Sequence, residues 1–533
     1  MPLSDIKREY IVTVKEHGNL ENLYDAMETP GSDGFCPERE VELIARRTIS
    51  RNTHYKLSEL DVDKLKNHPD VISVVLAPHE RGSIAEAFWE PQTGDFQKNT
   101  TFTSGQLQWG LKRVIDGQQT TNWGTDGSPV INDTIVTGSS GKNVDVVIVD
   151  SHIRPDHPEF WVNQNNTASR VNQLNWFGEY AASIGDSYGT GKNYVYSTQG
   201  WGPAMNSNHG THVAGTAAGN TQGWARDANI YNIQFDTSRV NYESGTSYPD
   251  FAIYIFDYIR EFHRKKPVNS KTGRKNPTIT NHSWGYSQGN PDYSSINSVT
   301  YRGTTTTVTG TNNERLAILA ANGCPTPMSN YLRRVPGREP PIDADVEDAI
   351  KDGILVIGAA GNSYWLMDLA GRPDWDNYYT AIGTGDHYHS RGSSPGSADG
   401  AICVGAIGTL KDEYKSDFTN IGARVDIYAP GSDIISAVWD NGAVTEWGSP
   451  VVPDPRDSSY ELTDISGTSM ACPQVCGYLA CLLEQEPNMT QAEALQHLID
   501  TSKKDQISSE SAAEGYGEAE YTTPGTYQWT CPA

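Results

Sequence analysis

Long hydrophobic runs are missing from this chain of 533 residues. Its most apolar stretches, VDVVIVD and ILVIGAA, are far shorter than the roughly 20 residues that span a bilayer. The opening segment, MPLSDIKREYIVTVKEHG, contains no apolar core of the kind found in secretory signals. The sequence therefore predicts neither a membrane-spanning helix nor a signal peptide. It favours synthesis in the cytoplasm and leaves the final location open.

Cysteine is also scarce, and its seven copies are an odd number. They contain no C-x-x-C pair or other zinc-ligand spacing. Three of them fall within one apolar segment (472–481), where cysteine packs as a small hydrophobic side chain. A disulfide framework is therefore not expected, which is typical of proteins made in a reducing compartment.

Positive charge is the third shortage. Lys and Arg total 41 against 66 Asp and Glu, which gives a net charge of −25. Such a surface disfavours nucleic acid and anionic membranes as partners. The carboxylates could bind divalent cations, although a solvated acidic face is the commoner explanation.

Residues 1–80 alternate between strand and helix patterns. EYIVTVK (9–15) is apolar at every second position, and NLENLYDAME (19–28) follows as a helix. A polar strand or hairpin, a short helix and the closing strand VISVVLAP (71–78) complete the segment. Strand–helix–strand repeated twice predicts a small α+β domain of the ferredoxin-like, split βαβ kind. Residues 81–105 are polar and are predicted to be a linker.

From residue 106 to 505 the pattern predicts a large α/β domain. Continuous apolar runs recur as NVDVVIVD (143–150), NIYNIQFD (229–236), TITN (278–281), GILVIGAA (353–360) and AICVGAIG (401–408). Such runs, separated by helices, indicate a mainly parallel central sheet covered on both faces, a three-layer architecture. Residues 290–345 are predicted to be a Thr-, Asn- and Pro-rich insertion, and 506–533 an acidic, irregular tail.

Four polar residues stand where such a sheet places catalytic groups, at or beyond the carboxyl ends of strands. Asp150 ends the first apolar run, and Asn362 follows GILVIGAAG. His209 begins HGTHVAG, where His212 competes with it for a catalytic role. Ser469 begins an apolar helix, whose N-terminal amides and dipole favour an anion. Each has a common structural explanation: a strand-end Asp, a buried structural His, a turn Asn and an N-cap Ser.

Taken together, the segments resemble the signature motifs of the subtilisin-like serine proteases, the subtilase family. VIVDSHI (147–153), HGTHVAG (209–215) and GTSMACPQVCG (467–477) resemble its aspartate, histidine and serine motifs, in the family's chain order. AAGN, TNHSWG, VDIYAPG and QLQWGLKRV (106–114) resemble further family segments. One departure is His152, where the family usually has glycine, and a side chain there could crowd the turn.

The resemblance implies a subtilisin-like serine endopeptidase that cleaves peptides or proteins and needs no cofactor for its chemistry. Asp150, His209 and Ser469 would be the catalytic triad, and Asn362 would bind the oxyanion. Structural calcium is common in the family, and Asp374 and Asp376 are candidate ligands without a diagnostic spacing.

The resemblance also implies a set of substrate-binding residues. One group would pair as an edge strand with the substrate, and the other would line the S1 pocket. These residues are Ser283, Trp284 and Gly285 for the strand, and Ala359, Ala360 and Gly361 for the pocket. The bulk of Trp284 would narrow or redirect the S4 region.

Residues 1–80 resemble the inhibitor-type prodomains of subtilases. We therefore expect a zymogen whose own N-terminal domain is its inhibitor, with a processing site within 81–105. Two alternatives remain at this point: the domain could be a permanent accessory, and the chain could be a silent structural or binding protein that retains the fold. A non-proteolytic esterase would instead be expected to carry a G-x-S-x-G elbow, whereas Ser469 lies in G-T-S-M-A.

Overall fold

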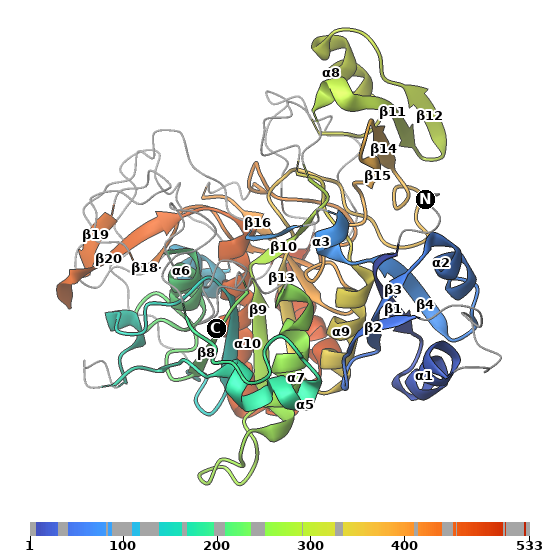
Figure 1. The fold of residues 1–533 in the computed structure, drawn as a ribbon. Helices are drawn as coiled ribbons and strands as arrows, with labels where there is room; N and C mark the ends of the chain where they lie inside the picture. The colour runs from blue at the N-terminus through green and yellow to red at the C-terminus, as the bar shows by residue number, and fades with distance from the viewer. Residues whose placement is uncertain are drawn as a thin grey trace.

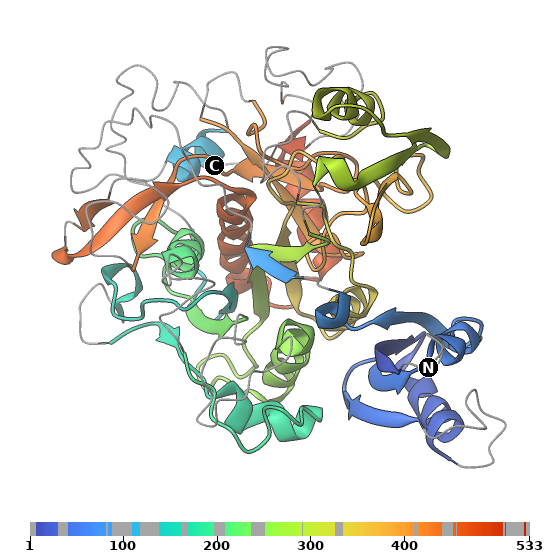
Figure 2. The same cartoon turned by 45° about the horizontal axis from the view of Figure 1, so that its top comes forward.

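A computed structural model shows how these segments are arranged (Figures 1 and 2). It describes residues 7–29, 41–81, 84–87, 109–117, 138–162, 168–196, 208–235, 251–289, 292–325, 334–409, 414–439, 451–454, 456–504, 507 and 527–528.

The N-terminal residues form a small α+β unit with its own sheet (Figure 1, blue). Its strands are β1 (Arg8–Val14), β2 (Glu42–Arg46), β3 (Asn52–Leu57) and β4 (Val71–Leu76), and its helices α1 (Leu20–Glu28), α2 (Glu59–Leu65) and α3 (Pro78–Arg81). The strand order β2-β3-β1-β4 and the antiparallel pairing are those of the predicted ferredoxin-like unit. A separate apolar core, which includes Val12, Leu23 and Leu65, holds the helices against the sheet.

The main sheet follows the order β21-β22-β17-β16-β13-β9-β6-β8-β7. Its strands are β6 (Asp145–Asp150), β7 (Val171–Asn172), β8 (Asn229–Gln234), β9 (Thr278–His282), β13 (Leu355–Ala359), β16 (Ile402–Ile407), β17 (Ile427–Pro430), β21 (Lys503–Lys504) and β22 (Tyr527–Gln528). Neighbours run parallel except for β21 and β22. The predicted fold class, an α/β domain with a mainly parallel sheet behind a small α+β unit, is confirmed.

Helices cover both faces of this sheet, because successive side chains of its strands point to opposite sides. Val146 and Ile148 belong to the apolar core on one face, called here the first core. Val147 and Val149 belong to the second core, on the other face. The helices are α4 (Trp109–Asp116), α5 (Ala182–Ile184), α6 (Asn208–Ala218), α7 (Ile255–Lys265), α9 (Pro340–Lys351), α10 (Thr468–Gln485) and α11 (Gln491–Thr501).

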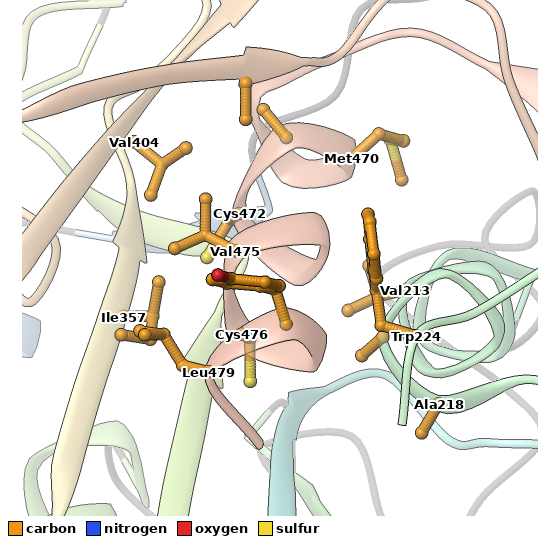
Figure 3. Packing of buried hydrophobic residues seen from close by; sticks show 14 of the residues in the cluster. Val213, Ala218, Trp224, Ile357, Val404, Met470, Cys472, Val475, Cys476 and Leu479 are labelled. Carbon is orange, nitrogen blue, oxygen red and sulfur yellow. The ribbon is translucent and has the colours of Figure 1, made fainter. Parts of the chain in front are cut away.

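Helix α10 crosses the middle of the first core, packed between the sheet and α6 (Figure 3). Cys472, Val475, Cys476 and Leu479 are all fully buried, as expected for a helix that is apolar nearly all round. A Cβ atom on Gly477 would lie 2.1 Å from the carbonyl oxygen of Ala217, so α6 and α10 can approach this closely only through glycine.

Two smaller antiparallel sheets are built on this frame. The first has the order β12-β11-β14-β15 and carries α8 (Asn312–Ala320); its strands are β11 (Ile296–Tyr301), β12 (Thr304–Thr307), β14 (Tyr378–Ala381) and β15 (Gly385–Tyr388). The second joins β18 (Ile434–Val438), β20 (Asp457–Ile465) and β19 (Val451–Asp454). Part of the predicted insertion 290–345 thus forms regular structure, and β22 lies in the segment predicted to be an irregular tail.

The described part of the chain contains five cysteines, all buried and free; Cys36 and Cys531 lie outside it. No helix among the described residues is long and apolar enough to cross a bilayer.

Several buried histidines predict a loss of stability in mild acid. Burial lowers the pKa of His157 to about 4 and those of His282 and His389 to about 3. An unfolded histidine binds its proton near pH 6.5, so acid favours the unfolded chain. Stability should be fully present above that pH and fall below it, by about 1.4 kcal/mol per pH unit for each such histidine.

We expect the melting temperature of the Ser469→Ala protein to fall between pH 6.5 and 5. Replacing Ser469 prevents the self-digestion that the resemblance to the subtilases implies. A melting temperature that stayed constant over this interval would contradict the prediction.

Candidate active site

Asp150 and His209 meet at the carboxyl edge of the main sheet. Asp150 is the last residue of β6, and His209 is the second residue of α6. The Asp150 Oδ1 atom lies 2.7 Å from His209 Nδ1 and also accepts a hydrogen bond from the Ser151 amide. A carboxylate in this position fixes the imidazole with its Nδ1 protonated, which leaves Nε2 as the basic nitrogen.

Local packing explains why glycine follows His209. A Cβ atom on Gly210 would lie 2.4 Å from the carbonyl oxygen of Ser151, and the Gly210 amide donates to Ser151 Oγ at 2.8 Å. The first turn of α6 therefore rests directly on the chain that follows Asp150. This contact brings the histidine up to the carboxylate.

His212 lies one turn further along α6 and has a different environment. Its Nε2 atom donates to the carbonyl oxygens of Ile434 and Thr463, at 2.8 and 3.3 Å. Burial lowers the pKa of His212 to about 3, so the ring stays neutral and acts as a structural donor. Of the two histidines that the sequence left in competition, only His209 contacts Asp150.

Ser469 is the second residue of α10 and is fully buried in the structure. Its Oγ atom donates to the carbonyl oxygen of Ser283 at 3.1 Å, and Ser283 Oγ donates to the carbonyl oxygen of Ser469 at 2.8 Å. The helix N-terminus at Ser469 supplies amides without intrahelical acceptors and a favourable dipole for a nearby anion.

Asn362 connects the end of β13 to the start of α10. Its Oδ1 atom accepts hydrogen bonds from the Thr468 amide and the Thr468 Oγ1 atom, at 2.9 and 2.8 Å. Its Nδ2 atom is buried and has no hydrogen-bond partner within the described residues. A buried amide with one end fixed and the other end unsatisfied is suited to bind a developing negative charge.

Two supporting residues around Asn362 were not identified from the sequence. Thr468 holds the Asn362 side chain, and its Oγ1 atom also accepts from the Gly361 amide at 3.1 Å. Asn420 donates to the Ala360 carbonyl oxygen and accepts from the Ser363 amide, at 2.8 and 3.1 Å. Thr468 lies within the recognised serine motif, whereas Asn420 carries no signal in the sequence because its contacts are distant in the chain.

The residues predicted to bind substrate fall into two groups, one after β9 of the main sheet and one at the end of β13. Ser283 lies between β9 and β10 (Trp284–Ser287), and Gly285 is within β10. Ala359 ends β13, and Ala360 and Gly361 follow it; Gly361 has a φ of 103°, which favours glycine. Ser283 contacts Ser469, and the Gly361 amide donates to Thr468 Oγ1.

Trp284 does not occupy an open position. Its side chain is fully buried and stacks on Phe235 with ring centroids 4.7 Å apart. The bulky Trp284 side chain is therefore packed into the second core, where it supports β10.

Strand β5 (Ile84–Ala87) pairs antiparallel with β10, within the segment predicted to be a linker. The register places Glu86 opposite Gly285 and Ala87 opposite Trp284. A stretch of the chain's own N-terminal part thus lies along the strand predicted to receive substrate (Figure 2, where blue β5 meets green β10).

His152 replaces the usual glycine without disturbing Asp150. Its ring packs between Tyr196 and Trp439, with centroids 5.5 and 5.0 Å away, and its Nε2 atom lies 2.5 Å from Gln173 Nε2. Burial lowers its pKa to about 4, so the ring is neutral near pH 7.

The two candidate calcium ligands do not fit such a site. Asp374 forms a two-point ion pair with Arg302, at 2.9 and 3.0 Å, and Asp376 pairs with Arg391 at 2.6 Å. Among the described residues there is no cluster of three or more His, Cys, Asp or Glu side chains that could hold a metal ion.

An aspartate–histidine pair and a serine at a helix N-terminus, carried by a mainly parallel sheet that helices cover on both faces, are features expected of a serine hydrolase. The Subtilase family model matches residues 141–517, so the chain belongs to the subtilase family. It is a subtilisin-like serine endopeptidase.

Comparisons with individual proteins agree with this assignment. A subtilisin-like protease of Coccidioides posadasii is 24% identical over 93% of this chain and 71% of its own length. Alkaline protease 2 of Aspergillus fumigatus is 22% identical over 99% of this chain and 82% of its own. Fervidolysin from Fervidobacterium pennivorans has a similar fold, with a TM-score of 0.50 and 17% identity over 98% of this chain and 60% of that chain.

Proposed function

We propose that Asp150, His209 and Ser469 carry out peptide hydrolysis as a catalytic triad, with Asn362 as an oxyanion donor. The observation that carries this proposal is the 2.7 Å contact between Asp150 and His209, at the same sheet edge as Ser469. His209 would take the proton of Ser469 as the hydroxyl attacks the scissile carbonyl, and would then protonate the leaving amine.

Negative charge on the carbonyl oxygen would be stabilised by Asn362 Nδ2 and by the Ser469 amide at the start of α10. Water would then attack the acyl-enzyme, with His209 again acting as the base. No cofactor is needed, because the nucleophile, base and oxyanion donors all belong to the chain.

We further propose that the protein is made as a zymogen inhibited by residues 1–80 together with strand β5, which follows them. Pairing of β5 with β10 supports this proposal, because an extended substrate would add to the same strand edge. As β5 proceeds from Ile84 to Ala87, its partners in β10 go from Ser287 back to Trp284. The residue before Trp284 is Ser283, which contacts Ser469. Self-cleavage would therefore fall a few residues after Ala87, within the predicted linker.

We expect purified wild-type protein to release an N-terminal fragment that ends shortly after Ala87, while Ser469→Ala stays whole. Masses of the two proteins after parallel incubation measure this difference. Addition of the isolated fragment to the processed enzyme should inhibit it. An intact wild-type chain with full activity would mean that the N-terminal unit is a permanent accessory domain.

A further inference from the structure

The loop between β2 and β3 enters the face formed by α7 and α9. Arg47 Nε donates to Asp257 Oδ2 on α7 at 2.7 Å, and Arg47 Nη2 donates to Asp345 Oδ2 on α9 at 2.6 Å. The side chains of all three residues have no solvent-exposed surface. One guanidinium of the N-terminal unit thus joins two helices of the protease domain.

Further hydrogen bonds fix the same loop from both sides. Ser50 Oγ donates to Asp345 Oδ1 at 2.5 Å, and Asn52 Nδ2 donates to the Pro341 carbonyl oxygen at 3.0 Å. In the opposite direction, Arg260 of α7 donates to the Ile49 carbonyl oxygen at 2.5 Å. These hydrogen bonds add to the match in charge between the loop and the helix face, although Arg47 Nη1 and Asp257 Oδ1 are buried without a partner among the described residues.

Arg51 extends the contact towards the surface of α9. Its Nη2 atom donates to Glu347 Oε2 at 2.7 Å and to the Ala344 carbonyl oxygen at 3.1 Å, and its Nε atom donates to Asp348 at 3.2 Å. The Glu347 side chain is partly exposed, so water screens this outer pair more than the Arg47 pairs.

The neighbouring Arg46 provides a natural contrast. Its guanidinium stacks over Tyr24, 4.1 Å from the ring centroid, and pairs with Glu28. Both partners belong to the N-terminal unit, and the Arg46 side chain is 42% exposed. Two adjacent arginines therefore have different functions: one serves its own unit and the other serves the interface.

We propose that Asp257 and Asp345 form an arginine socket, a second binding site on the protease domain that holds the N-terminal unit through Arg47. Guanidinium suits this socket because its nitrogens donate in fixed directions to two separate carboxylates, which a lysine ammonium does not match. Burial raises the pKa of both carboxyl groups, that of Asp345 to about 6. The positive charge of Arg47 opposes this shift and stabilises the ionised carboxylates.

The socket gives the inhibitor two points of attachment, a consequence that rests on the proposed zymogen function. Strand β5 pairs with the predicted substrate strand β10 and leads to the bond that would be cut, whereas the socket lies on helices α7 and α9 and does not depend on that bond. The cleaved fragment should therefore stay bound through Arg47 after its peptide bond to the enzyme is broken.

Hydrogen–deuterium exchange of the full chain in the Ser469→Ala background tests the socket without any proteolysis. Removal of one partner of a buried charge pair costs about 10²–10³-fold in the equilibrium that it supports. Arg47→Ala should therefore raise exchange at least about tenfold in peptides that cover residues 46–51, and Arg47→Lys should give an intermediate rise. Arg46→Ala, the matched control, should leave these peptides unchanged.

Peptides from β1 and β3 report whether the N-terminal unit itself stays folded. Protection of residues 46–51 in Arg47→Ala equal to that of the parent would overturn the proposal. If β1 and β3 also lose protection, Asp345→Ala decides, since it leaves the N-terminal sequence intact. Faster exchange of the loop in Asp345→Ala supports the socket, and unchanged exchange refutes it.

Gel filtration of the processed, catalytically active protein tests the consequence for inhibition. The fragment should co-elute with the enzyme in the parent and in Arg46→Ala, and should separate from it in Arg47→Ala. Co-elution in all three proteins would show that the socket does not retain the fragment. Absence of any cleavage would contradict the zymogen proposal alone, and the exchange experiment would still decide the socket.

Discussion

Ser469→Ala should abolish measurable peptidase activity while the protein stays folded. The substitution removes the only oxygen that could form the acyl-enzyme in the proposed mechanism. In subtilisin the equivalent loss lowers kcat about 10⁶-fold, and we expect a similar effect here. Hydrolysis of a peptide substrate, measured beside the melting temperature, reports activity and folding separately.

A serine-directed phosphonate provides the control for this result. Wild-type enzyme should be labelled at Ser469 and protected by a competing peptide, and the variant should not be labelled. Residual activity above about a hundredth of wild type would exclude Ser469 as the nucleophile.

Asn362→Ala should lower kcat by about 10²–10³-fold with little change in KM, the loss seen when subtilisin loses its corresponding oxyanion donor. The Asn362 Nδ2 atom has no partner within the described residues, so its hydrogen bond would form mainly in the transition state. Steady-state kinetics with one peptide substrate measure both constants.

Asn362→Asp is the matched variant for this test. An aspartate can keep the shape of the side chain but replaces the amide donor with an acceptor. It should lose at least as much kcat as the alanine variant. An effect confined to KM in Asn362→Ala would show that the residue binds substrate rather than the oxyanion.

Apolar runs predicted the strands of the main sheet, because such runs indicate burial and are visible in a single sequence. The runs NVDVVIVD (143–150) and GILVIGAA (353–360) contain the fully buried strands β6 and β13. The ends of two predicted strands pointed to Asp150 and Asn362, because a parallel sheet gathers catalytic residues at its carboxyl edge. Ser469 was predicted at a helix start, and the resemblance to the subtilase motifs implied the roles of all these residues.

Contacts between distant segments could not be read in the same way. Strand β5 has no clear apolar alternation, and its place depends on hydrogen bonds to β10, about 200 residues further along the chain. The choice between His209 and His212 depended on which ring reaches Asp150 and which reaches backbone carbonyls.

The sequence by itself determined the family, the fold class and the residues from which an active site could be built. Only the tertiary structure decided their surroundings: the hydrogen bonds that fix Asn362, the burial of Trp284, and the pairing of Arg47 with two aspartates. Motifs and periodicity record local constraints, whereas a hydrogen bond or ion pair also depends on where the fold brings its second partner.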